Sequence, residues 1–372
     1  MMIYGSDKMK EIRIDNFINN TKDWETILAK KNIDIRKDKD YVLLKYDILA
    51  DFSNEIVQQA RGIIYRKENG KYICVCRPFD KFFNYQETNA IDIDWKSARV
   101  QEKIDGSIIK LWYDKFRWNW STNGVIDAFN SDVNGFISFG ELIQKADNYK
   151  DIDFDSLDKD YTYMFELISP YNQVVIQYDK IHLYHIGTRN NITGEEINPD
   201  IGIEKPREYK LASLDECVEA VNAMNDNTMD QEGFVVVDDN YNRIKIKSPK
   251  YFMYHHMWNN GAISPKRIIG IIKEGNMNDA MEHFPILTED ILKYNAAMSI
   301  YRYKAQKIIN NARSLYEEFD NDRRAASKVI NTFEYPNIGY WSIDNEGNAD
   351  DYINSMKENN YIKTIENEVS KL

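Results

Sequence analysis

The feature that most constrains the fold of this chain is a change of hydrophobic patterning near residue 253. Over residues 41–250 the apolar positions form short β-branched and aromatic runs broken by turn residues, as strands do. Beyond this segment they recur at helical spacing, and Ser264-Pro265 is typical of a helix N-cap followed by proline in the first turn. The pattern predicts an α+β protein with a strand-rich domain over residues 1–252 and an all-helical domain over residues 253–372.

The strands of the first domain are expected to pair in antiparallel fashion. The segment RGIIYRKENGKYICVCRPF holds two strand-like runs around Asn69-Gly70, a dipeptide that supplies the positive φ angles of a tight hairpin. The same kind of pattern predicts further strands at Ser107–Tyr113, Arg117–Ser121, Tyr161–Ile168, Val174–Tyr178 and Ile181–Thr188, and helices at Ile137–Ala146 and Leu211–Met224.

Composition excludes a protein that coats nucleic acid through a general positive field. The 372 residues include 48 basic and 60 acidic side chains, which gives a net charge of −12, so any contact with a polyanion needs a local basic cleft. Cys74, Cys76 and Cys217 form neither a C-x-x-C pair nor a zinc-ligand spacing, which favours a reducing compartment. No run reaches the roughly 18 apolar residues that a membrane helix needs. We expect a cytoplasmic monomer with no membrane partner.

The first candidate for chemistry is Lys103 in the string Lys103-Ile104-Asp105-Gly106, which stands just before the strand SIIKLWY. A K-x-D-G string alone is weak evidence, because it arises by chance in roughly one chain in ten of this length. A solvated turn is the alternative interpretation of this string.

The stretch RIKIKSPKY offers two more cations. Alternation along a strand places Lys245 and Lys247 on one face and Ile244 and Ile246 on the other. The two ammonium groups then point the same way, although a half-buried sheet with one solvated face shows the same pattern.

Two glutamates stand at informative positions. Glu232 precedes Gly233 at the start of the apolar run in QEGFVVV, and Glu166 alternates with Met164 and Ile168 in YTYMFELIS. A buried glutamate is unfavourable unless it meets a cation, a metal or a hydroxyl group. Glu166 is therefore more informative than an exposed acid.

These pieces, in this order, resemble the motifs of the phage T4-type RNA ligase 1 family of ATP-dependent RNA ligases. The resemblance covers roughly residues 41–252 and includes five collinear elements, which are far more specific together than any one of them. It implies a nucleotidyltransferase domain built on antiparallel sheets around a nucleotide cleft. It assigns catalytic roles to Lys103, Asp105, Lys245 and Lys247, and nucleotide-binding roles to Tyr46, Arg61, Lys81, Gly106, Glu166, Lys245 and Lys247.

In this family the lysine of K-x-D-G attacks the α-phosphate of ATP, so the resemblance implies that Lys103 becomes a lysyl-adenylate. A lysine is nucleophilic only when neutral, and its ordinary pKa of roughly 10.4 must be lowered by nearby cations, a metal or desolvation. ATP and Mg²⁺, with Mn²⁺ as a substitute, are the expected cofactors. The candidate metal ligands are Glu166, Glu232 and Asp105, and Glu166 is alternatively a ligand of the ribose hydroxyls.

The implied substrate is RNA with 5′-phosphate and 3′-hydroxyl ends, and a family role in repair makes cleaved tRNA a candidate. We expect the helical domain to select the RNA. One departure from the family pattern is Asn123, which stands before Gly124 where the family has a lysine. This departure puts one triphosphate contact in question, and Lys110 or Arg117 is a candidate to replace it.

Three other functions stay open on the sequence alone. A DNA ligase or an mRNA capping guanylyltransferase shares the lysine chemistry, but both usually carry an OB-fold after the fifth motif, where this chain has a helical pattern. An RNA-binding module that has lost catalysis is the third alternative. Retention of every charged motif residue except the one replaced by Asn123 argues against it.

Overall fold

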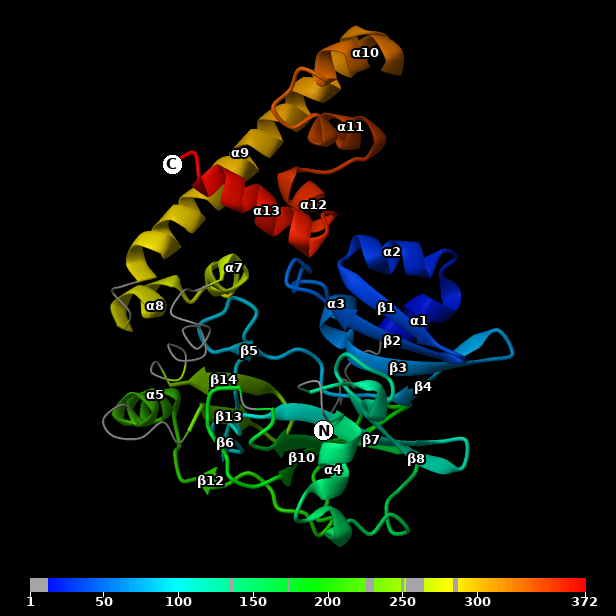
Figure 1. The fold of residues 1–372 in the computed structure, drawn as a ribbon, viewed down its shortest axis with the longest axis vertical. Helices are drawn as coiled ribbons and strands as arrows, with labels where there is room; N and C mark the ends of the chain where they lie inside the picture. The colour runs from blue at the N-terminus through cyan, green and yellow to red at the C-terminus, as the bar shows by residue number, and fades with distance from the viewer. Residues whose placement is uncertain are drawn as a thin grey trace, which may run out of the picture. The chain divides into compact units, whose positions relative to one another are not determined.

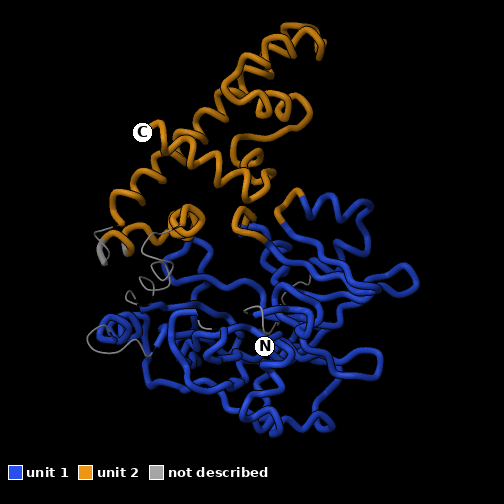
Figure 2. Tube along the Cα trace, viewed as in Figure 1, with its two compact units in different colours: residues 1–29, 33–46, 52–261 blue, residues 30–32, 47–51, 262–372 orange. Residues whose placement is uncertain are grey.

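The computed structural model describes residues 13–133, 137–172, 174–224, 231–248, 251, 264–283 and 287–372. The chain forms two compact units, which have different colours in Figure 2. The first unit comprises residues 1–29, 33–46 and 52–261, and the second comprises residues 30–32, 47–51 and 262–372. The predicted domain boundary after residue 252 lies outside the described residues, so it stays a prediction.

The first sheet of the first unit is an antiparallel meander of four strands (Figure 1). Its strands are β1 (Ile33–Asp38), β2 (Tyr41–Tyr46), β3 (Arg61–Glu68) and β4 (Lys71–Cys76). Asn69 and Gly70, between β3 and β4, have φ angles of 49° and 80°, so the predicted tight hairpin is confirmed. Three short helices lie in the same part of the chain: α1 (Arg13–Asn20), α2 (Trp24–Lys30) and α3 (Glu55–Gln59).

The second sheet has the strand order β11-β10-β9-β7-β8 and is antiparallel throughout. Its strands are β7 (Ser107–Asp114), β8 (Arg117–Thr122), β9 (Tyr161–Ile168), β10 (His182–Asn190) and β11 (Glu196–Ile197). Helix α4 (Phe139–Lys145) begins with a capping box formed by Ser138 and Glu141. Its Leu142 and Ile143 join the core cluster that holds Leu111 of β7 and Phe165 of β9. Four of the five further strands predicted from the sequence are therefore confirmed.

The third sheet has the order β12-β6-β13-β14-β5 and contains one parallel pair, β14 with β5. Its strands are β5 (Phe83–Asn84), β6 (Arg99–Glu102), β12 (Glu208–Tyr209), β13 (Gly233–Val237) and β14 (Arg243–Lys247). Helix α5 (Leu214–Ala223) packs Cys217 and Val221 against Phe234 of β13 and Ile246 of β14. The two sheets that contain β7 and β6 support the two ends of the K-x-D-G segment.

The predicted strand Val174–Tyr178 is wrong, because these residues form bends. The physical reason is Asp105, whose Oδ2 accepts hydrogen bonds from the backbone N–H groups of Val175 and Ile176 at 2.9 and 2.6 Å. Backbone donors that are bound to a side chain are not available to a neighbouring strand.

The second unit is helical in all of its described elements (Figure 1). These are α7 (Pro265–Lys273), α8 (Met277–His283), α9 (Thr288–Glu318), α10 (Arg323–Ile330), α11 (Pro336–Asp344), α12 (Ala349–Asn354) and α13 (Glu358–Val369). Ala297, Tyr301, Ala305 and Ile309 recur every four residues along α9 and are buried in the core of this unit. The predicted α+β fold, with antiparallel sheets followed by helices, is confirmed. Across the described ranges, every helix is too short or too polar to cross a membrane.

Candidate active site

Lys103 and Lys247 share the carboxylate of Glu232. Lys103 Nζ lies 2.5 Å from Glu232 Oε2, and Lys247 Nζ lies 3.2 Å from Glu232 Oε1. The backbone supports this contact, because Lys103 N donates to Gly233 O at 2.8 Å where β6 ends and β13 begins. Gly233 has a φ of 140°, and a Cβ there would lie 2.1 Å from Ile246 O, so glycine permits the close approach of β13 and β14.

Glu232 is a buried charge with two cationic partners. Its side chain is only 3% exposed, against 21% for Lys103 and 28% for Lys247. Burial alone would raise the pKa of Glu232, but the ammonium groups of Lys103 and Lys247 outweigh burial and lower it. The glutamate is therefore ionised at neutral pH and holds both lysines at the end of the sheet.

The predicted alternation along β14 is confirmed. Ile244 and Ile246 are buried, whereas Lys245 and Lys247 are half-buried on the other face. Arg243 lies on the same face as these lysines, where it pairs with Glu196 at 2.6 Å. Our sequence analysis missed Arg243, although the alternation that selected the two lysines extends to it.

Arg61 and Lys245 converge on one aromatic ring. Arg61 Cζ lies 5.0 Å and Lys245 Nζ 5.2 Å from the ring centroid of Phe82. Beside them, Lys81 Nζ lies 4.2 Å from the ring centroid of Phe52 and 5.6 Å from that of Tyr46. The structure therefore brings the upstream candidates Tyr46 and Lys81 together, and it places Arg61 and Lys245 at the same aromatic ring.

Glu166 lies on β9 beside the K-x-D-G segment. A Cβ on Gly106 would come within 3.1 Å of Glu166 Cγ and 2.5 Å of Leu167 O, which explains why glycine occupies position 106. Burial raises the pKa of Glu166 to about 7; Lys103 and Arg61 oppose this rise, while Glu232 and Asp105 add to it. At Glu166, burial therefore outweighs the nearby cations, whereas at Glu232 two direct ion pairs outweigh burial.

Asp105 has a different environment, although it belongs to the same motif. It is 3% exposed, and besides the two backbone donors on Oδ2 it accepts a hydrogen bond from the Tyr251 hydroxyl on Oδ1 at 2.6 Å. Burial raises the pKa of Asp105 even though these donors act to lower it. No local pattern in the sequence indicates the contact with Tyr251, which lies 146 positions away. Asp105 organises the segment after β9 in this structure, and its predicted role as a metal ligand stays a prediction.

Comparison with known proteins decides the family. The family model described as RNA ligase, of the T4 RNA ligase 1 type, matches residues 59–254, which include Lys103, Glu166, Glu232, Lys245 and Lys247. The chain belongs to this RNA ligase family. The fold and motifs predicted from the sequence are in agreement with this membership.

Two relatives of this RNA ligase family member are viral. A candidate bifunctional polynucleotide kinase/RNA ligase of Autographa californica nuclear polyhedrosis virus is 30% identical, over 70% of this chain and 40% of that protein. An RNA ligase of Rhodothermus phage RM378 is 26% identical, over 68% of this chain and 72% of that protein. Among solved structures, an archaeal ATP-dependent RNA ligase aligns at 12% identity and a TM-score of 0.45, over 72% of this chain and 75% of that one.

In this RNA ligase family member, a cation lies beside Asn123, which stands at the position of the expected family lysine. Gly62, which has a φ of 84°, lies close to both residues. A Cβ added to it would be 2.7 Å from Asn123 O and 2.9 Å from Lys110 Nζ. Lys110 donates a hydrogen bond to Gly62 O, and burial lowers its pKa to about 8, with Arg61 adding to the effect. Of the two candidates to replace the family lysine, Lys110 therefore lies beside Asn123. Arg117 lies at the opposite end of β8.

The candidate metal ligands do not form a ready-made metal centre. Within the described ranges, no group of three or more His, Cys, Asp or Glu side chains is arranged to hold a metal ion. Glu166 and Glu232 are nevertheless close enough for each charge to affect the other, and Glu166 has a raised pKa. Two neighbouring carboxylates, one of them with a raised pKa, offer oxygen ligands to a cation. Such a pair fits a hydrated divalent cation that is held by few direct bonds.

Proposed function

We propose that this protein is an ATP-dependent RNA ligase that joins a 5′-phosphate RNA end to a 3′-hydroxyl RNA end. The observation that carries the proposal is the position of Lys103, 2.5 Å from the buried carboxylate of Glu232, which also binds Lys247. Lys103 is partly exposed within this charged cluster, as a nucleophile that must reach a phosphate has to be.

The proposed reaction has three steps. Nζ of Lys103 attacks the α-phosphorus of ATP; a P–N bond forms, the bond to pyrophosphate breaks, and the amine proton passes to solvent. A 5′-phosphate oxygen of RNA then attacks the same phosphorus and releases Lys103. Finally the 3′-hydroxyl attacks the RNA 5′-phosphorus, loses its proton to solvent, and releases AMP as the phosphodiester forms.

The ion pair between Lys103 and Glu232 must open before the first step, because an ammonium group has no free electron pair. We propose that Arg61 and Lys245, which both lie about 5 Å from the ring centroid of Phe82, stabilise charge that develops on the phosphate oxygens. We expect Glu232 and Glu166 to hold Mg²⁺, or Mn²⁺ in its place, which supplies further positive charge. Asp105 supports the segment after β9, and Lys81 and Tyr46 are proposed contacts of the nucleotide.

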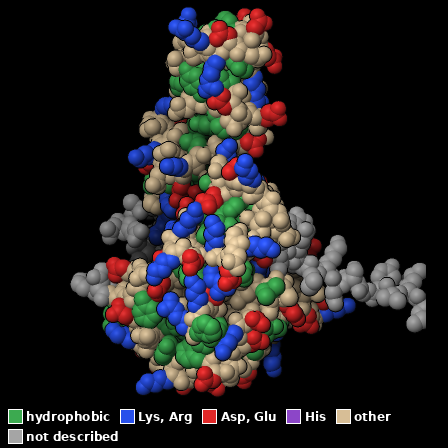
Figure 3. Space-filling model, turned by 90° about the vertical axis from the view of Figure 1, so that its right-hand side faces the viewer, with side chains coloured by type: hydrophobic (Ala, Val, Ile, Leu, Met, Phe, Trp, Pro, Cys, Tyr) green, Lys and Arg blue, Asp and Glu red, His purple; other side chains and the backbone are tan. Residues whose placement is uncertain are grey.

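The proposed natural substrate is a structured RNA such as a cleaved tRNA, selected by the helical second unit. On the face shown in Figure 3, Lys and Arg side chains are interspersed with Asp and Glu side chains. The protein has a net charge of −12, so it has no general positive field that would attract RNA. Binding through a few defined contacts is compatible with this charge. We further propose that the enzyme acts as a monomer in the cytoplasm.

Incubation with ATP labelled on the α-phosphate tests this function. We expect one covalent AMP on the wild-type protein, none on Lys103→Ala, and a normal amount on the matched control Lys115→Ala, an exposed lysine that pairs with Asp40 at 2.8 Å. Peptide mapping that places AMP on another lysine would contradict the assignment. Absence of any label would contradict the function itself.

The same assay distinguishes the neighbouring activities. A guanylyltransferase takes its label from GTP, and a DNA ligase transfers its label to nicked DNA in preference to RNA. We expect labelling from ATP and transfer to a 5′-phosphate RNA end. An RNA-binding module without catalysis acquires no covalent label from either nucleotide.

A further inference from the structure

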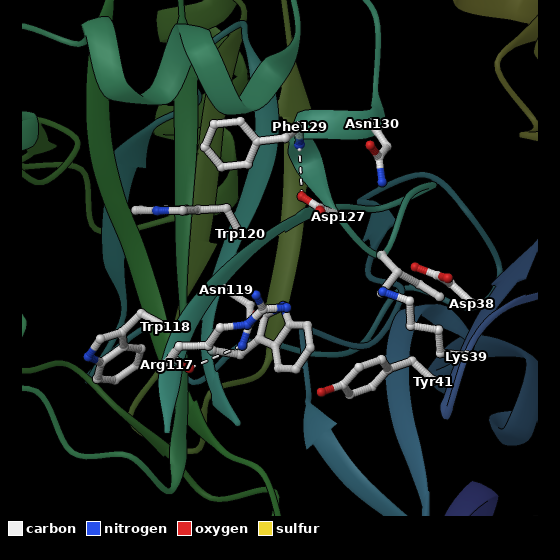
Figure 4. A pocket seen from close by; sticks show the side chains of 12 residues that line it. Asp38, Lys39, Tyr41, Arg117, Trp118, Asn119, Trp120, Asp127, Phe129 and Asn130 are labelled. Carbon is white, nitrogen blue, oxygen red and sulfur yellow. Dashed lines mark hydrogen bonds between the residues drawn. The ribbon is translucent and has the colours of Figure 1, made fainter. Parts of the chain in front are cut away.

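A pocket with a volume of about 220 Å³ lies in the first unit, apart from the residues of the candidate active site (Figure 4). Its walls come from the turn between β1 and β2, the hairpin of β7 and β8, and the segment that follows β8. Trp112 of β7 lies five residues beyond Ser107, which directly follows the K-x-D-G segment. At about 3.3 Å per residue, the strand spans roughly 17 Å between these two positions.

The inner wall of the pocket contains an unsatisfied donor. Trp112 lines the pocket and is 1% exposed, and its indole Nε1 has no hydrogen-bond partner within the part of the chain that the structure describes. A buried N–H group without an acceptor is unfavourable and rare in folded proteins. Because this nitrogen has almost no surface open to solvent, a ligand in the pocket cannot bond to it in the structure as described, and Trp112 contributes ring surface to the wall.

The wall around this donor is held firmly. The ring of Tyr41 meets the ring of Trp112 edge-on at 5.5 Å, and the Tyr41 hydroxyl donates to Asp114 at 2.7 Å. Asp114 also pairs with Arg66. The ring of Tyr41 is therefore held by Trp112, and its hydroxyl is held by a carboxylate that is itself paired. This arrangement gives the pocket a preformed aromatic wall, as ligand-binding pockets commonly have.

The rim of the pocket is polar and carries no excess charge. Figure 4 shows Arg117 and Asn119 on one side and Lys39 and Tyr41 on the other. The acids Asp38 and Asp127 balance the two cations in the lining. A phosphate group alone would find little net attraction here, whereas a flat ligand whose edge carries both donors and acceptors matches this chemistry. A nucleobase is such a ligand.

We propose that this pocket holds one unpaired base of the RNA substrate, at a distance along the strand from the end being joined. The proposal rests on the proposed function, since it names part of the substrate of that same enzyme. The volume of about 220 Å³ lies below the roughly 300 Å³ at which pockets for drug-sized ligands begin, so it suits a single base. Recognition of single-stranded RNA commonly uses splayed bases that contact aromatic rings and bond through their edges.

Joining assays with RNA acceptors that each lack one base, at successive positions from the 3′-hydroxyl, test the proposal. We expect one position at which loss of the base raises the KM for RNA on the order of 10-fold. Asn119→Ala should raise the KM for intact RNA by a similar factor, and it should add little on the RNA that lacks the critical base. Trp112→Phe, which makes the aromatic wall smaller and keeps a ring, should behave in the same way.

Two controls make the outcome decisive. Phe116 is 96% exposed at the tip of the same hairpin and does not line the pocket, so Phe116→Ser should leave the KM for RNA unchanged. Self-adenylation with ATP alone should be unchanged in Asn119→Ala, which verifies that the variant is folded. Photo-cross-linking of 4-thiouridine at the critical position should label a peptide that contains residues 38–41 or lies within residues 112–130.

The possible failures are distinguishable. If the wild-type protein labels itself but joins no RNA, or acquires no label, the proposed function fails. If it joins RNA, yet no single missing base changes the KM, or Asn119→Ala and Trp112→Phe keep the wild-type sensitivity to the missing base, the pocket does not hold a base of the substrate. A cross-link outside residues 38–41 and 112–130 would overturn the proposal in the same way.

Discussion

Glu166 is the acid of the candidate site whose protonation is expected to change near neutral pH. Burial raises its pKa to about 7 from an ordinary value of 4.5, so between these values the folded protein holds a proton that the unfolded chain has lost. The free energy of unfolding therefore falls as the pH rises from 4.5 through 7. Glu166→Gln stays neutral, so its stability relative to wild type should rise by up to about 3 kcal/mol across this range. Urea denaturation at a series of pH values measures the difference.

The exposed residue Glu141 provides a control of opposite sign. Hydrogen bonds from Ser138 lower its pKa, so it stabilises the fold above its ordinary pKa and this contribution is lost as the pH falls. The stability of Glu141→Gln relative to wild type should therefore decrease as the pH rises through the acidic range. A flat profile for Glu166→Gln would mean that Glu166 has an ordinary pKa, which would remove the argument that burial outweighs the nearby cations.

At the scale of elements, the segment after β9 depends on one buried carboxylate. Asp105→Asn leaves Val175 N and Ile176 N with a weaker, uncharged acceptor, and it should lower the free energy of unfolding by about 1–3 kcal/mol. Tyr251→Phe removes the third donor to Asp105 and should cost about 1 kcal/mol alone. In the double variant the two losses should be less than additive, because both act on the same carboxylate.

Tyr163→Phe is a matched control for this cycle. Its hydroxyl accepts a hydrogen bond from Asp158 N at 2.9 Å and has no contact with Asp105 in the described structure. The costs of Tyr163→Phe and Asp105→Asn should therefore add. Additive costs for Tyr251→Phe and Asp105→Asn would show that the bond between these residues does not support the segment.

The elements also show what one sequence can predict. Alternation along residues 243–247 and the Asn69-Gly70 turn were predictable because strand faces and tight turns depend on neighbouring residues. The segment Val174–Tyr178 has the composition of a strand, but the distant carboxylate of Asp105 binds two of its backbone N–H groups. The shared contact at Glu232 likewise joins Lys103 to a residue 129 positions away, which no local pattern reveals. The motif resemblance assigned both residues to one site, but it did not predict that they form an ion pair.

At the scale of the whole molecule, the chain enters the second unit more than once. Residues 30–32 and 47–51 belong to it, and Leu49 is fully buried with Ile269 and Tyr301 in its core. Hydrophobic periodicity needs windows of about 11 residues or more, so insertions as short as these leave no signal in the pattern. Removal of residues 262–372 therefore deletes the helices and also exposes Leu49, whose buried partners are lost.

Because Leu49 belongs to the second unit, one substitution is expected to be destabilising in the full chain and not in a fragment that lacks the helices. In the full chain, Leu49→Asn places an amide in an apolar core and should lower the free energy of unfolding by about 2–4 kcal/mol. In a fragment of residues 1–261 the same change should cost nothing and reduce aggregation, since Leu49 has no helical core to enter. Leu43, fully buried in the first unit, is the control, because Leu43→Asn should be costly in both proteins.

Cooperative melts of the four variants measure these costs, and self-adenylation of the Leu49→Asn fragment measures the chemistry. All candidate residues from Tyr46 to Lys247 lie in the first unit, so a folded fragment should still acquire AMP on Lys103. It should also lose any preference of the full protein for a nicked stem-loop RNA over an unstructured strand of equal length. An equal cost of Leu49→Asn in the fragment and in the full chain would show that the first unit itself buries Leu49. The fragment could then be tested without that substitution, and the selection of RNA could be assigned to the helices directly.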